Sequence, residues 1–145
     1  MSKTWWSRLV LVAALALAMS VGGGVAKAAP AAASANVCTS ISGAIGDHMC
    51  TYINGSGTYV NYARVAVYRV KPQSICNYYA TFTVYDSSGV KIYSKTSAYH
   101  SGCLWGYFAS RQIDVYRSFP NNSKACGSWF QDGGRLGTSC ARIYA

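Results

Sequence analysis

The sequence has no glutamate, four aspartates and two histidines among its 145 residues. A glycosidase of the paired-carboxylate type needs two acids about one sugar apart, and two of the four aspartates, Asp86 and Asp132, fall in predicted turns. Zinc and calcium sites need several ligands at characteristic spacings, and no such spacing occurs. The scarcity of acids and ligands argues against a glycosidase, and we expect no metal and no cofactor.

Other catalytic motifs are also missing. The chain contains no G-x-S-x-G nucleophile motif and no glycine-rich loop placed before a helix to hold phosphate. Residues 36–145 show no 3.6-residue apolar period, so no helix is predicted there. What remains is a series of short alternating segments separated by turn residues, which is typical of an all-β protein.

One long apolar run occurs, and it lies near the N-terminus: residues 9–21 read LVLVAALALAMSV. Lys3 and Arg8 precede the run, and small-x-small sites end at Ala28 and Ala35. These features predict a secretory signal peptide over residues 1–35, cleaved after Ala28 or Ala35. Its alanine-rich composition suggests a bacterial source.

The run is shorter than the ~20 residues of a membrane-spanning helix. We therefore expect no transmembrane segment in the mature chain. We expect a secreted or extracellular protein. Association of the secreted protein with the cell envelope is the alternative. Residues 36–145 then form a single disulfide-bonded β domain, a size that suits one hydrophobic core.

All six cysteines lie in residues 36–145. An even number of cysteines in a small exported domain predicts disulfides, and six allow fifteen pairings. A hairpin centred on residues 132–134 would place Cys126 directly opposite Cys140, close enough to bridge. Residues 36–50 are predicted to form a short loop or edge strand that a Cys38–Cys50 disulfide would close. The two remaining cysteines, Cys76 and Cys103, would then form the third pair.

The clearest structural signal is the segment 76–97, CNYYATFTVYDSSGVKIYSKTS. Its first half alternates with period two, and Asp86 to Gly89 fits a hairpin turn. The predicted register sets Tyr85 opposite Lys91 and Val84 opposite Ile92, which would keep apolar side chains on one face. With the second hairpin, this predicts an all-β, antiparallel β-sandwich (Ig-like or Greek-key) or small barrel, stabilised by disulfides.

Residues 36–145 carry ten basic and four acidic residues, a net charge of +6. Charge of this sign favours anionic partners, and tyrosine suits half-exposed contact surfaces. The predicted outer face of the hairpin would carry Tyr79, Tyr85, Lys91, Tyr93 and Lys95. We therefore expect a secreted, non-enzymatic binding module for a cell-wall polymer, another anionic or glycan-rich surface, or a second secreted protein. The oligomeric state remains open.

Two alternatives belong to other classes of protein. His48 and His100 in a basic chain could act as base and acid on a phosphodiester, which would make the protein a small secreted nuclease or toxin with nucleic acid as its partner. A rigid exposed loop near a disulfide could instead inhibit a protease, and residues 98–106 around Cys103 are the candidate segment.

Overall fold

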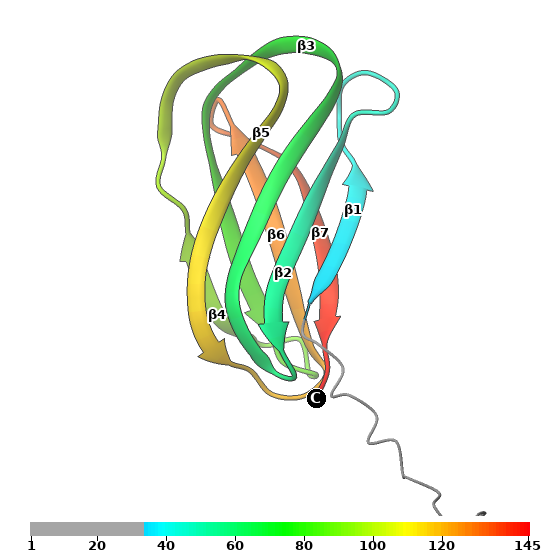
Figure 1. Cartoon of the computed structure of the whole chain (residues 1–145), viewed down its shortest axis with the longest axis vertical. Helices are drawn as coiled ribbons and strands as arrows, with labels where there is room; N and C mark the ends of the chain where they lie inside the picture. Colours follow the sequence, from blue (N-terminus) through cyan, green and yellow to red (C-terminus); the bar gives the residue numbers. More distant parts are fainter. Residues whose placement is uncertain (1–33) are drawn as a thin grey trace, which may run out of the picture.

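The computed structural model describes residues 34–145. The predicted signal peptide lies outside the described residues except for Ser34 and Ala35. The described chain is all β, as predicted, and its antiparallel sheet is nearly closed into a barrel (Figure 1). The strands are β1 (Ala35–Ser40), β2 (His48–Ser56), β3 (Tyr59–Tyr85), β4 (Lys91–Thr96), β5 (His100–Ser118), β6 (Ser123–Gln131) and β7 (Gly134–Ile143). Within these residues no helix is long and apolar enough to cross a membrane.

Strand β1 begins at Ala35, which packs against the core. A cut after Ala35 would therefore remove the first residue of the strand, whereas a cut after Ala28 would leave the strand whole.

Strand β3 has 27 residues and organises the whole sheet. Its first part pairs with β2, its last part pairs with β4 and β6, and β5 pairs with it along both parts. The β3–β5 register is interrupted between Tyr68 and Gln73, where β3 bends over one end of the molecule (Figure 1). Pro72 lies in this interruption. Proline has no backbone N–H to donate, so it cannot take part in the strand ladder. The strand bends at this proline and continues to Tyr85.

The sheet order is β1-β2-β3-β6-β7, and β1 lies against β7 at the closure. The Thr51 and Ser139 hydroxyls, on β2 and β7, are hydrogen-bonded at 2.6 Å inside the barrel. Apolar side chains from nearly every strand fill the interior, with Trp129 and Phe82 the largest that are fully buried. Because alternate residues of each strand point inward, the opposite set forms the outer surface.

Gly127, on β6, occurs where two layers of the barrel approach closely. A Cβ atom at this position would overlap the Thr51 hydroxyl and come within 2.8 Å of Val65 Cγ2. We expect Gly127→Ala to lower the free energy of unfolding by about 1–3 kcal/mol, because overpacking displaces neighbouring side chains. Urea denaturation measures this effect. Gly106→Ala is the matched control, since a Cβ there meets nothing within 4 Å, and equal losses in the two variants would contradict the packing argument.

Three disulfides join neighbouring strands: Cys38–Cys50, Cys76–Cys103 and Cys126–Cys140. They are the pairings that the sequence suggested. In each case the two cysteines are directly opposed in an antiparallel ladder, with Cα atoms 4.0 Å apart. This short separation is typical of a non-hydrogen-bonded pair, the position from which a bridge forms across two strands.

The hairpin of β3 and β4 corrects the predicted register. The turn forms as expected: the Asp86 amide donates to the Val90 carbonyl, and Gly89 has φ +84°. Tyr85 lies opposite Lys91, but Val84 lies opposite Tyr93 and not opposite Ile92. Ile92 is thus an extra residue, a β-bulge, and it reverses which side chains of β4 point inward.

The bulge places the Tyr93 ring against the core. The ring meets Phe82 and Phe119 edge-on, at centroid distances of 6.4 and 5.4 Å. Ile92 is left 37% exposed. The predicted register buried Ile92 and exposed Tyr93. The observed register is favoured because the Tyr93 ring makes edge-to-face contacts with two buried phenylalanine rings.

Candidate binding face on strands β4, β3, β6 and β7

The register of four strands builds one continuous outer face. Directly opposed residues in an antiparallel ladder point to the same side of the sheet. Tyr85 lies opposite Lys91 on one side and Lys124 on the other, and Lys124 lies opposite Arg142. Three cations and one tyrosine therefore line up across the sheet, and we call this set (Lys91, Tyr85, Lys124, Arg142) the cationic row.

Hydroxyl side chains occupy the next two rows of the same face. Four of them cross the sheet in one row, and two more lie between that row and the cationic row, beside the Cys126–Cys140 bridge. We call these six residues the hydroxyl rows: Thr96, Thr81, Ser128, Thr138, Ser94 and Thr83. Hydrogen bonds join Ser128 to Thr138 at 2.7 Å and Thr83 to Ser94 at 3.3 Å. These cross-strand bonds orient the hydroxyl groups.

Aromatic rings lie at the end of the face away from the cationic row. Tyr79 is opposite Phe130, and their rings are stacked with centroids 4.7 Å apart and planes within 1°. Tyr99 packs at a tilt against Tyr79 at 6.2 Å, and Arg135 is opposite Phe130. Stacked rings of this kind offer a flat apolar surface beside polar groups.

A shallow cavity of about 280 Å³ adjoins the cationic row. Its lining consists of Tyr85, Asp86, Ser87, Gly89, Lys124 and Arg142. Arg142 Nη1 donates to the carbonyl and side-chain oxygens of Asn122, at 3.1 and 3.2 Å, which positions the guanidinium. Asp86 Oδ1 accepts from the Ser88 and Val90 amides, both at 2.9 Å, so its carboxylate is committed to the turn. The cavity therefore presents two cations with hydrogen-bonding capacity.

The five sequence-predicted binding residues divide between the two sides of the sheet. Tyr79, Tyr85 and Lys91 lie on the outer face. Tyr93 points inward, and its burial raises the pKa of its hydroxyl, an effect that nearby Arg117 opposes. Lys95 lies on the same side as Tyr93, and its Nζ donates to the Asp114 carbonyl at 2.7 Å. The prediction that Tyr93 and Lys95 share one face with Tyr85 and Lys91 was wrong, because the Ile92 bulge reverses β4; Lys95 is nevertheless exposed.

Sequence reasoning missed Lys124, Arg142 and the hydroxyl rows. The second hairpin, β6 and β7, was predicted, so the Lys124–Arg142 pairing followed from its register. What the sequence did not reveal is that β3 and β6 pair along Tyr78–Tyr85. This pairing joins the two hairpins into one face.

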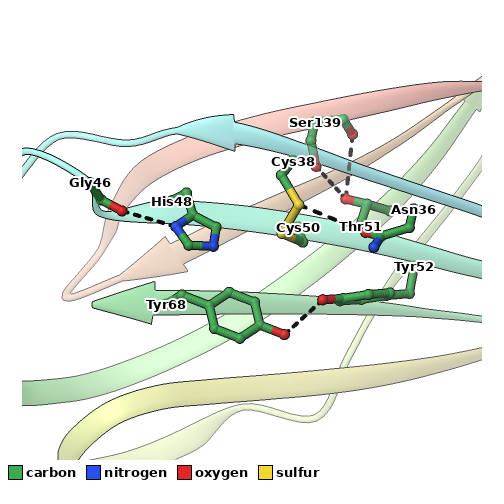
Figure 2. The surroundings of a disulfide bond; sticks show 9 residues. All are labelled: Asn36, Cys38, Gly46, His48, Cys50, Thr51, Tyr52, Tyr68 and Ser139. Carbon is green, nitrogen blue, oxygen red and sulfur yellow. Dashed lines mark hydrogen bonds between the residues drawn. A yellow bond between two sulfur atoms is a disulfide. The ribbon is translucent and has the colours of Figure 1, made fainter. Parts of the chain in front are cut away.

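Each of the two histidines belongs to its own aromatic stack. The His48 ring stacks on Tyr68 with centroids 4.9 Å apart, and its Nδ1 lies 2.9 Å from the Gly46 carbonyl oxygen (Figure 2). The His100 ring stacks on Tyr78 at 4.5 Å. Tyr68 and Tyr78 lie on opposite sides of the β3 bend. Asp47, which precedes His48 in the chain, directs its carboxylate to Arg69 at 3.0 Å.

The tyrosine beneath His48 is held in its neutral form. The Tyr68 and Tyr52 hydroxyls are 2.7 Å apart (Figure 2). Burial, together with this hydrogen bond, raises the pKa of Tyr68 to about 12. The Tyr68 hydroxyl therefore stays protonated to a higher pH than an ordinary tyrosine does.

The segment proposed as an inhibitory loop is mostly strand. Residues 100–106 belong to β5 and pair with β3, and the Cys76–Cys103 disulfide lies within this ladder. Residues 101–105 are exposed, so the segment is a braced, exposed ribbon.

These features define a small disulfide-bonded β domain with a polar, cationic outer face. No family model matches the chain, and no curated protein matches it. Among the solved structures that align with the chain is the Pseudomonas fluorescens alkylpurine DNA glycosylase AlkC bound to DNA containing an abasic site analog, with 12% identity and a TM-score of 0.32. The alignment covers 67% of this chain and 26% of that chain, about a quarter of its length. Similarity at this level carries no argument about fold or function.

Proposed function

We propose that the protein is a secreted, non-enzymatic binding module whose outer face holds an anionic, glycan-rich polymer such as one of the cell wall. The alignment of the cationic row with the hydroxyl rows on one face is the observation that supports this most directly. The row offers charge to acidic groups of the polymer, and the hydroxyl rows offer donors and acceptors to its sugars.

The distribution of charge favours an anionic partner. Arg69 and Asp47 form a buried ion pair, which leaves nine basic and three acidic residues in 36–145 to interact with other molecules. All three of these acids accept hydrogen bonds within the chain: Asp86 from its turn, Asp132 from Asn77 at 3.0 Å and Asp114 from Gln112 at 2.9 Å. The basic residues still outnumber the acidic ones by six, and a net positive charge attracts polyanions.

The spacing of the face suits a repeating ligand. Neighbouring strands lie about 4.8 Å apart, and alternate residues of one strand about 6.6 Å apart. A single hydroxyl contact contributes only about 0.5–1.5 kcal/mol, so useful affinity requires many contacts made together. A polymer supplies them, because each engaged unit raises the effective concentration of the next.

Charge reversal on the cationic row tests the proposal. We expect K124E/R142E to weaken binding to dextran sulfate and to purified bacterial cell wall about tenfold or more, given roughly 1 kcal/mol for each exposed charged contact. Binding of the wild type should also fall as salt rises. Uncharged dextran, compared with dextran sulfate by titration calorimetry, measures how much the anionic groups contribute.

The control variant R64E/R117E makes the same change in net charge on two exposed arginines outside the cationic row. Wild-type affinity in this control, together with loss in K124E/R142E, would support the site. Equal loss in both variants would show that net charge alone drives binding, and unchanged binding in K124E/R142E would exclude the cationic row.

A further inference from the structure

The end of the barrel at the β3 bend carries a cluster of exposed apolar side chains. We call this cluster the apolar tip, and it consists of Ile45, Val70, Leu104, Trp105, Tyr107 and Phe108. Trp105 is 69% exposed, and Ile45 is fully exposed. Figure 1 shows the β3 bend, the upper part of β5 and the loop between β1 and β2 together at this end. The cluster shares no residue with the outer face proposed above.

The register and the loop contacts bring these residues together. Trp105 is opposite Ser74, and Phe108 is opposite Tyr68, on the two sides of the bend. Val70 lies in the bend itself, and its amide donates to Asp47 Oδ1 at 2.9 Å. That bond holds the loop that carries Ile45 against the bend, where Gly46 approaches Val70 so closely that a Cβ would come within 2.8 Å of Val70 Cγ1.

Apolar side chains are exposed on both faces of the ribbon. Consecutive residues of a strand point to opposite faces, and the two consecutive pairs Leu104–Trp105 and Tyr107–Phe108 are all exposed. A flat protein partner would cover one face and leave the other in water. A fluid medium that surrounds the ribbon covers both faces.

The charges near the apolar tip indicate which kind of fluid phase would cover it. Within residues 41–47, 69–74 and 100–108, the one carboxylate is Asp47, which is buried and paired with Arg69. The one exposed charge there is that of Lys71. The neighbouring β6–β7 turn, which is bonded to Asn77, adds the exposed Asp132 and Arg135, whose charges cancel. Tryptophan and tyrosine are favoured at the boundary between lipid headgroups and acyl chains, and cations are attracted by anionic headgroups.

We propose that the apolar tip inserts shallowly into the interface of an anionic lipid bilayer. The Cys76–Cys103 disulfide and the buried Asp47–Arg69 pair hold the ribbon and the loop in place, so little conformational freedom is lost on insertion. The depth is limited to the headgroup region, where water still satisfies the free edge of the ribbon.

Vesicle binding tests this proposal with protein recovered from a secreting host and its N-terminus checked by intact mass. We expect the wild type to sediment with vesicles of phosphatidylcholine and phosphatidylglycerol, and more weakly with phosphatidylcholine alone. The fluorescence emission of Trp105 should shift to the blue. Subtraction of the W105F spectrum from the wild-type spectrum separates the Trp105 signal from that of buried Trp129. The variant W105S/F108S should lose at least tenfold in partitioning, because it removes two exposed aromatic side chains whose burial in the lipid interface would stabilise the bound state.

The matched control is Y59S/Y116S, which removes two exposed aromatic rings outside the apolar tip and should stay within twofold of the wild type. Dextran sulfate binding by W105S/F108S should be unchanged, so failure here is distinct from failure of the polymer proposal. Absence of wild-type vesicle binding, or equal binding by W105S/F108S, would overturn the inference. So would a shift of W105S/F108S to a smaller oligomer by size exclusion without any vesicle effect, since the tip would then be a self-association surface.

Discussion

Replacement of Asp47 by asparagine should lower the free energy of unfolding by about 3–5 kcal/mol, the usual cost of leaving one member of a buried ion pair without its partner. The Asp47 side chain is fully buried, and Arg69 is nearly so. Asp47 Oδ2 accepts from Arg69 Nη1 at 3.0 Å, and Oδ1 accepts from the Val70 amide at 2.9 Å. An amide side chain cannot neutralise the guanidinium and offers one acceptor in place of two.

Urea denaturation at pH 7 measures this loss, and Asp114→Asn is the control because Asp114 is exposed. A loss below 1 kcal/mol in Asp47→Asn would show that the buried pair does not stabilise the fold.

The same carboxylate gives the protein a pH dependence. Burial alone would raise the pKa of Asp47, but hydrogen bonds from the Val70 amide and Arg69 outweigh burial and hold the pKa below its ordinary value of 3.8. A group with a lowered pKa in the folded state stabilises the protein fully above its unfolded pKa. This contribution is lost as pH falls below about 4 and through the folded pKa. The melting temperature of the wild type should therefore fall more steeply in acid than that of Asp47→Asn.

The second large effect concerns the disulfide that closes the longest loop. Cys76 and Cys103 are 27 residues apart, against 12 for Cys38–Cys50 and 14 for Cys126–Cys140. Removal of a cross-link raises the entropy of the unfolded chain, more for a longer loop. We expect C76A/C103A to lose about 3–4 kcal/mol, and C38A/C50A to lose somewhat less.

Chemical denaturation of the two double variants compares their losses of unfolding free energy directly. Mass spectrometry should first confirm that the two remaining disulfides of each variant are formed. The reverse order would show that native-state contacts of the Cys38–Cys50 bridge outweigh the entropy of its short loop.

Local chemistry made much of the fold predictable. The Asp86–Gly89 turn follows from residues that favour such a turn, and the Cys126–Cys140 pairing follows from the short loop between β6 and β7. The orientation of β4 did not follow, because one bulged residue, Ile92, reverses a whole strand and depends on rings contributed by distant segments such as Phe119.

The candidate site was predictable only in part for the same reason. Tyr85 and Lys91 are neighbours across a local hairpin, and their pairing was predicted correctly. Lys124 joins them through the pairing of β3 with β6, which connects segments far apart in the chain. Alternation within a strand indicates which side chains share a face, but it carries no information about which strands become neighbours.

The pairing of β3 with β5 on both sides of the β3 bend also affects the order in which the chain folds. Their pairs are nested: Tyr78–His100 encloses the shortest stretch of chain, and Tyr59–Ser118 encloses the longest. Loop closure costs more entropy as the enclosed chain lengthens, so zippering from the inner pair outward is the least costly order. Cys76 and Cys103 lie near the start of that path. Oxidation of this pair would therefore fix the ribbon early and shorten every later closure, which would make folding faster in an oxidising compartment than in a reducing one.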